Sequence, residues 1–168
     1  MRRFVVLGAL LLTGTAAWAC GDKLLAFGRG VRFQRAYAAA RQANVVIYAS
    51  GTESGATLKA PKLQTTLKQI GHKLQTVQDA AGLEQALKAG RVDVVLADVT
   101  DAAAIARQLQ SATSKPVVLP VLFKPSKADL ASAQKQYSFA LKAPGDEVQY
   151  LVAIDEVMKS RVKAAAKS

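Results

Sequence analysis

Residues 92–99 have the sequence Val-Asp-Val-Val-Leu-Ala-Asp-Val, and this stretch decides the fold. Its apolar residues follow one another without the strict alternation of a strand that has one wet face. Such a strand is typical of a sheet that is covered on both faces. Helices cover both faces when they connect parallel strands, because a parallel neighbour needs a long crossover. We therefore expect an α/β domain built around residues 92–99.

Strands and helices alternate on both sides of this stretch. Further strands are expected at residues 45–48, 73–77, 116–123 and 137–141. Helices are expected from Pro61 to Ile70, from Asp79 to Gly90, from Thr100 or Asp101 to about Gln110, from Ser126 with Asp129 as a capping box, and from Asp146. Right-handed crossovers then predict a three-layer, doubly wound domain whose five-stranded parallel sheet has the order 2-1-3-4-5.

The chain has four predicted parts. Residues 1–19 resemble a secretory signal peptide, with Arg2 and Arg3 before an uncharged apolar run and small residues at its end. Residues 20–43 form an extension with a short strand and a helix, residues 44–161 form the α/β domain, and residues 162–168 form a basic tail. The end of the chain is expected to fray from Lys159. The signal peptide predicts an exported protein of the periplasm or cell envelope.

Cys20 is the one cysteine of the chain and follows the predicted cleavage site. A bacterial lipoprotein carries its lipid-modified cysteine at this position, and Ala19 fits that motif, whereas Trp18 does not. An ordinary signal peptidase cutting the same bond would leave a free cysteine. Two alternatives stay open: Cys20 is a lipid anchor that attaches the protein to a membrane, or it is an unmodified first residue.

The chain is strongly basic, with a formal net charge of +11. Removal of the signal peptide with its two arginines lowers this charge but leaves the protein strongly basic. This charge favours anionic surface partners. Arg32 and Arg35, with Arg29 and Arg41, give the segment nearest Cys20 a basic surface, which is either a solvated helix face or a contact with an anionic membrane. Nucleic acid is not expected as a partner, because no binding motif accompanies the charge and the protein is predicted to be exported.

The stretch from Asn44 to Arg161 resembles a response-regulator receiver domain of the CheY-like, flavodoxin-like fold. Residues 94–99 resemble the strand that ends in the phospho-accepting aspartate, which is Asp98 here. Residues 139–144 resemble the last strand of the family, with Phe139 at the switch aromatic and Lys142 at the lysine. The family has lysine and proline in succession, and here Ala143 stands between them.

Two features of an active receiver are missing. The resemblance implies an acidic magnesium-binding pair at the end of the first strand, where this chain has Tyr48, Ala49 and Ser50. It also implies Ser or Thr at the end of the fourth strand, where Val121 stands. Phosphoryl transfer needs a metal to neutralise charge, and one carboxylate holds magnesium poorly. We therefore expect Asp98 to be a vestigial, exposed carboxylate at the sheet edge, near the N-termini of the following helices and paired with Lys142, or to keep a binding role.

A second motif follows the first strand. Thr52, Ser54, Gly55 and Thr57 lie between that strand and a helix and resemble the phosphate loop of flavodoxins. Hydroxyl and backbone N–H groups in such a loop bind the phosphate of FMN. The loops after the later strands have no aromatic residue to cover a flavin ring, and small polar residues are typical of any turn.

The remaining chemistry-bearing residues are isolated. His72 is a lone histidine in a predicted turn and forms neither a metal site nor a catalytic triad by itself. The sequence therefore predicts an exported, non-enzymatic pseudo-receiver without cofactor or metal, which binds a protein or an anionic surface. An FMN or phosphate binder using Thr52 to Thr57, and a receiver phosphorylated at Asp98, are the two alternatives.

Overall fold

The computed structural model describes residues 41–137 and 139–166. The predicted signal peptide, Cys20 and nearly all of the predicted extension lie outside the described residues. Among the described residues, no helix has the length and apolar character needed to cross a membrane.

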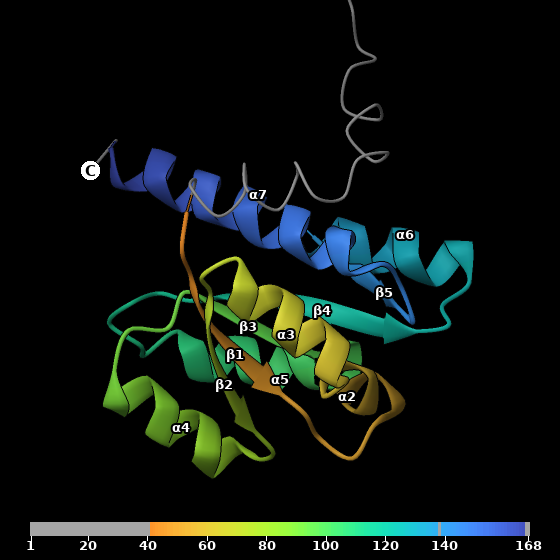
Figure 1. Ribbon diagram of the computed structural model, residues 1–168, viewed down its shortest axis with the longest axis horizontal. Helices are drawn as coiled ribbons and strands as arrows, with labels where there is room; N and C mark the ends of the chain where they lie inside the picture. The colour runs from red at the N-terminus through yellow and green to blue at the C-terminus, as the bar shows by residue number, and fades with distance from the viewer. Residues whose placement is uncertain (1–40, 138, 167–168) are drawn as a thin grey trace, which may run out of the picture.

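Five parallel strands form one sheet in the order β2-β1-β3-β4-β5, which confirms the predicted topology (Figure 1). The strands are β1 (Asn44–Tyr48), β2 (Lys73–Val77), β3 (Val94–Asp98), β4 (Val117–Phe123) and β5 (Leu141–Ala143). The helices are α2 (Glu53–Leu58), α3 (Pro61–Gln69), α4 (Ala80–Ala89), α5 (Val99–Leu109), α6 (Lys127–Gln136) and α7 (Glu147–Ala165).

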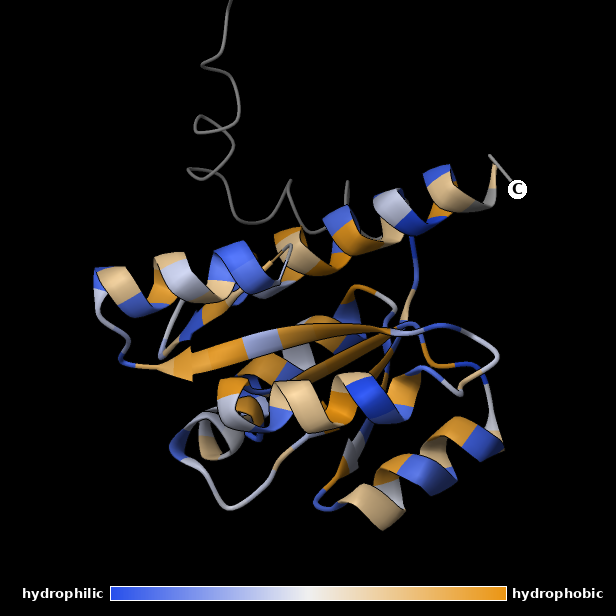
Figure 2. Cartoon of the chain, turned by 180° about the vertical axis from the view of Figure 1, so that it is seen from behind, coloured by the Kyte–Doolittle hydropathy of each residue, from blue (hydrophilic) through white to orange (hydrophobic). Residues whose placement is uncertain are grey.

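The central strand β3 is buried along its whole length, as its sequence predicts. Val94 and Leu96 face the larger core, to which α2, α3 and α7 contribute. Val95 and Ala97 face a second core under α4 and α5. Figure 2 shows the apolar central strands of the sheet with helices on both sides of them. Because both faces of β3 are buried, helices have to cover both sides of the sheet, and the domain therefore has three layers.

Local cap signals were predicted correctly at three helices. Asp79 accepts from the Gly82 N–H at the start of α4, and Asp146 accepts from the Val148 N–H at the start of α7. Ser126 and Asp129 form the predicted capping box of α6. These caps depend only on residues within one helical turn, so the sequence carries the whole signal.

Four predicted boundaries were wrong. The segment at 53–58 forms the short helix α2 rather than only a loop, and α5 begins at Val99, before its predicted cap. Strand β5 begins at Leu141, four residues later than expected. Helix α7 continues to Ala165 and so includes most of the residues that were predicted to form the basic tail. Its last turns contain alanine and lysine, which favour helix, and the Arg161 guanidinium bonds backbone carbonyls at Ser114 and Lys115.

Asp93 connects several elements at the end of the sheet where the strands begin. Its carboxylate accepts from the backbone and side-chain amides of Asn44 at 2.9 and 3.0 Å and pairs with Arg91 at 2.8 Å. Arg161 of α7 lies 3.4 Å from the same carboxylate. Burial alone would raise the pKa of Asp93, but the hydrogen bonds from Asn44 and Arg91 hold it below its ordinary value. A buried carboxylate is tolerated here because it is fully paired.

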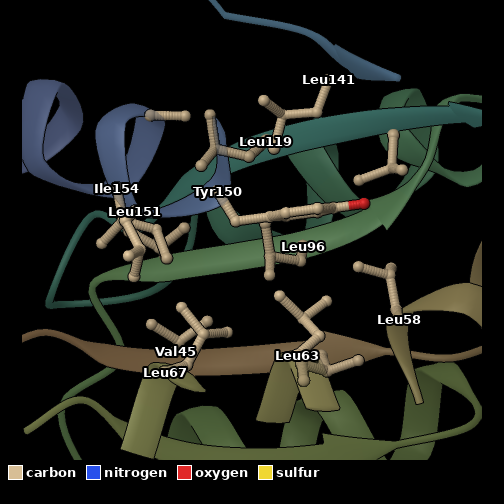
Figure 3. Packing of buried hydrophobic residues seen from close by; sticks show 14 of the residues in the cluster. Val45, Leu58, Leu63, Leu67, Leu96, Leu119, Leu141, Tyr150, Leu151 and Ile154 are labelled. Atoms are coloured by element: carbon tan, nitrogen blue, oxygen red, sulfur yellow. The ribbon is translucent and has the colours of Figure 1, made fainter. Parts of the chain in front are cut away.

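The larger core contains one buried hydroxyl group without a partner. Tyr150 is 2% exposed and lies in the cluster with Leu96 and Leu119 (Figure 3). Its hydroxyl oxygen has no hydrogen-bond partner in the described part of the chain. Burial, with the nearby charge of Glu147, raises the pKa of Tyr150 to about 12, so the phenol stays neutral. Such a group costs stability because its bonds to water are not replaced.

We predict that Tyr150→Phe raises the free energy of unfolding by about 1 kcal/mol, because it removes an unsatisfied polar atom and keeps the ring. Urea denaturation followed by circular dichroism measures the change. Tyr137→Phe, at a half-buried position, is the control and is expected to change stability by less than about 0.5 kcal/mol. A clear loss of stability in Tyr150→Phe would show that the hydroxyl has a partner.

Candidate functional site

The carboxyl ends of β1 and β3 bring together hydroxyl and carboxylate groups. Ser50 follows β1, and Asp98 and Asp101 lie at the junction of β3 and α5. The Ser50 hydroxyl donates to the Asp101 carboxylate at 2.6 Å. The Thr52 hydroxyl lies 3.4 Å from that of Ser50. Ligand-binding and catalytic residues of parallel α/β proteins lie at the carboxyl ends of the strands. We therefore take this cluster as the candidate site.

Asp98 is the N-cap of α5. Its Oδ1 accepts from the backbone N–H of Thr100 at 2.8 Å and from the Thr100 hydroxyl at 2.7 Å. Burial alone would raise the pKa of Asp98. The hydrogen bonds of Thr100, together with the hydroxyl of Thr52, nevertheless hold that pKa below its ordinary value. The carboxylate therefore stays ionised and compensates the positive end of α5.

The expected exposed ion pair between Asp98 and Lys142 is wrong. Asp98 is only 8% exposed, and the ion pairs of the described residues do not join it to Lys142. The register gives the reason. Asp98 aligns with Val121 and Val121 aligns with Leu141, so the next residue, Lys142, faces the opposite side of the sheet. Lys142 is exposed there.

The predicted cap of α5 at Thr100 or Asp101 was also wrong. Both residues lie inside the first turn of the helix, and Asp98 takes the cap position. Thr100 is instead the donor that holds the Asp98 carboxylate. Asp98, Thr100 and Asp101 are all residue types that form N-caps, and the sequence pattern alone did not show which of them caps the helix.

The four residues of the predicted phosphate loop lie together, but their polar groups already have partners within the chain. Thr52 caps α2 and accepts from the Gly55 N–H at 3.1 Å. The buried Ser54 hydroxyl donates to the Val121 carbonyl at 3.3 Å, and the Thr57 hydroxyl donates to the Glu53 carbonyl at 3.1 Å. A side chain on Gly55 would collide with the Ser50 carbonyl oxygen, so glycine serves close packing here.

The positions at which the resemblance implies magnesium ligands lie at the carboxyl end of β1. Tyr48 ends β1, and Ala49 and Ser50 follow it. Val121 is fully buried in β4 opposite Asp98. Within the described residues, no three His, Cys, Asp or Glu side chains are grouped so that they could hold a metal ion.

His72 is a buried structural residue. It is 7% exposed, and its Nδ1 accepts from the backbone N–H of Ala43 at 3.2 Å. Burial lowers the pKa of His72, and the charge of Asp155 opposes this effect. The neutral ring thus serves as an acceptor for the chain just before β1.

Phe139 lies apart from Asp98. It is half-buried just before the edge strand β5 and packs against the larger core. It also lines an apolar hollow of about 430 Å³ between α6, β5 and α7, with Leu141, Val152 and Ala153. The structure therefore does not bring the three vestigial receiver positions, Asp98, Lys142 and Phe139, into one site.

No family model matches the chain, and no curated protein matches it. The fold and the edge described above therefore carry the functional argument.

We predict that Asp98→Ala lowers the free energy of unfolding by about 1 kcal/mol at pH 7, because it removes a helix cap, and that Asp98→Asn loses less because Asn also caps. The pKa of Asp98 is lower in the folded chain, so its stabilisation is complete above the pKa of an unfolded aspartate and is lost as pH falls. The difference between wild type and Asp98→Ala should therefore shrink below about pH 4.

Urea denaturation at a series of pH values measures this difference. A carboxylate kept for ligand binding is commonly strained, and its removal then stabilises the fold. An Asp98→Ala variant more stable than the wild type at pH 7 would contradict the structural role.

Proposed function

We propose that this protein is an exported, non-catalytic interaction module with a receiver-like fold. The observation that carries the proposal is the use of Asp98 as the cap of α5, with both hydrogen bonds of Thr100 directed at one carboxylate oxygen. The residue that resembles a phospho-acceptor has a structural task in this chain. The export part of the proposal depends on the sequence of residues 1–19 alone.

The electrostatics of the edge argue against phosphoryl transfer. Bringing a phosphoryl group to Asp98 moves negative charge toward a carboxylate, and Asp101 adds a second negative charge nearby. A magnesium ion would have to offset both, yet Tyr48, Ala49 and Ser50 contribute no carboxylate from β1. Lys142, the cation that the resemblance implies, faces the other side of the sheet.

The same charges argue against the flavin alternative. A phosphate at residues 52–57 would lie beside the Asp98 carboxylate, which the hydroxyl of Thr52 already stabilises. Repulsion between the two anions would have to be overcome, and Ser54 would lose its bond to Val121. We therefore keep a binding role for the domain but do not place FMN in this loop.

We predict that the protein does not incorporate a phosphoryl group when it is incubated with acetyl phosphate and magnesium. The physical reason is the missing metal ligand set at β1. Intact-mass measurement under mild conditions detects the modification, with a phosphorylatable receiver domain in the same reaction as the positive control.

Stable incorporation that disappears in Asp98→Asn would overturn the proposal. It would mean that Asp98 and Asp101 hold magnesium without a carboxylate from β1 and that Thr100 releases Asp98. Incorporation that persists in Asp98→Asn would place the reaction at another residue, and the domain would again be catalytic.

A further inference from the structure

The two ends of the sheet carry different charges. We call one end of the sheet the amino end, because the strands start there, at Asn44, Lys73, Val94 and Val117. The amino end also includes the last turns of the neighbouring helices. In a parallel α/β domain each crossover helix runs back along the strands, so the helix starts lie at the opposite, carboxyl end. Acidic residues are concentrated at that end: Glu53, Asp98, Asp101, Asp129, Asp146 and Glu147.

The amino end is basic. Helix dipoles explain part of this, because Lys68, Lys88 and Lys163 lie in the last turns of α3, α4 and α7, where a cation is favoured. They do not explain Lys73 and Lys115, which stand at or just before the starts of strands β2 and β4 and are exposed. The positive charge therefore exceeds what helix stability requires.

Glu84 pairs with Lys88 on the surface of α4, but the other carboxylates nearest this end do not neutralise its exposed lysines. Asp93 is buried and is paired with Arg91 and Arg161. Asp155 of α7 is paired with Arg41 and Lys159. Lys68, Lys73 and Lys163, by contrast, have no carboxylate within ion-pair distance among the described residues.

An exposed apolar side chain lies within this basic end. Val162 is 56% exposed and is the one large hydrophobic residue of the described chain that is so exposed. It stands between Arg161 and Lys163 near the end of α7. An apolar side chain flanked by cations suits shallow insertion at a lipid interface. The described surface offers no exposed aromatic side chain on which nucleic-acid bases could stack.

The chain also enters the domain at this end. Arg41 contacts Asp155 of α7, and β1 starts three residues later, close to the last turns of α7 (Figure 1). The residues before Arg41 include Arg29, Arg32, Arg35 and the candidate anchor Cys20. Arg41, the first described residue, therefore lies at the basic end.

We propose that the amino end of the sheet is a membrane-docking surface that binds a bilayer of anionic phospholipids. This inference rests on the proposed function, because it names the partner of the interaction module. Lys68, Lys73, Lys115 and Lys163 attract the anionic headgroups, and Val162 inserts among them. The carboxyl end with Asp98 then faces away from the membrane.

The test is the binding of the full chain to vesicles of neutral phosphatidylcholine, with and without anionic phosphatidylglycerol. The measured quantity is the ratio of the affinities for anionic and neutral vesicles, because the apolar run at residues 4–17 contributes to both. The triple variant Lys68→Gln, Lys73→Gln, Lys163→Gln removes three charges from the amino end. The matched control Lys59→Gln, Lys127→Gln, Lys142→Gln removes three exposed, unpaired charges of the carboxyl end.

We expect the amino-end variant to lower the affinity ratio about 100-fold, at about fivefold per charge, and the control to lower it less than about threefold. Equal losses in the two variants, or no preference of the wild type for anionic vesicles, would overturn the proposal. A nucleic-acid duplex that displaces the protein from anionic vesicles at equal charge concentration would assign the surface to nucleic acid instead. Circular dichroism confirms that both variants are folded.

Incorporation of phosphate at Asp98 would refute the non-catalytic function but would leave this affinity ratio unchanged. A failure of the proposed function can therefore be distinguished from a failure of the membrane-docking proposal.

Discussion

Strand β3 has no side that faces water, and the rest of the structure depends on this constraint. All five of its residues are buried, with Val94 and Leu96 on one face and Val95 and Ala97 on the other. Each face has to be covered by helices, and helices on both faces are compatible with parallel strands joined by crossovers. The same geometry gathers the helix starts at one end of the sheet and the helix ends at the other. The capping carboxylates and the basic last turns therefore separate, and the domain becomes electrically polar.

The parts of the fold that could be predicted are those whose signal is local or repeated. Alternation of strands and helices is visible along the chain, and so are the caps at Asp79, Ser126 and Asp146, because each cap acts within one turn. The helix α2 was missed because six residues carry too little periodicity to separate a helix from a polar turn. The end of α7 was missed because the contacts of Arg161 with the loop before β4 connect residues far apart in the sequence.

The candidate site shows a similar limit. Asp93 and Asp98 stand at the two ends of the same apolar strand and look alike in the sequence. Asp93 is held by Asn44 and Arg161 from distant segments, whereas Asp98 is held by Thr100 two residues away. The resemblance to receivers correctly placed Asp98 at the carboxyl end of a strand. It did not show that Thr100 would occupy the carboxylate, or that the strand register would turn Lys142 to the other face. Pairwise geometry of this kind becomes visible only once the strands are aligned.

The central claim is that the Asp98 carboxylate is a structural cap and not a metal ligand. The most direct measurement is a magnesium titration of the isotope-labelled protein, followed by nuclear magnetic resonance at the backbone amides of Ser50, Thr100 and Asp101. If Asp98 remains bonded to Thr100, the Thr100 amide should keep its chemical shift through millimolar magnesium, since one capped carboxylate offers the ion too few oxygen ligands. Saturable shifts confined to these three amides, and absent in Asp98→Asn, would show a magnesium site at this edge and contradict the account.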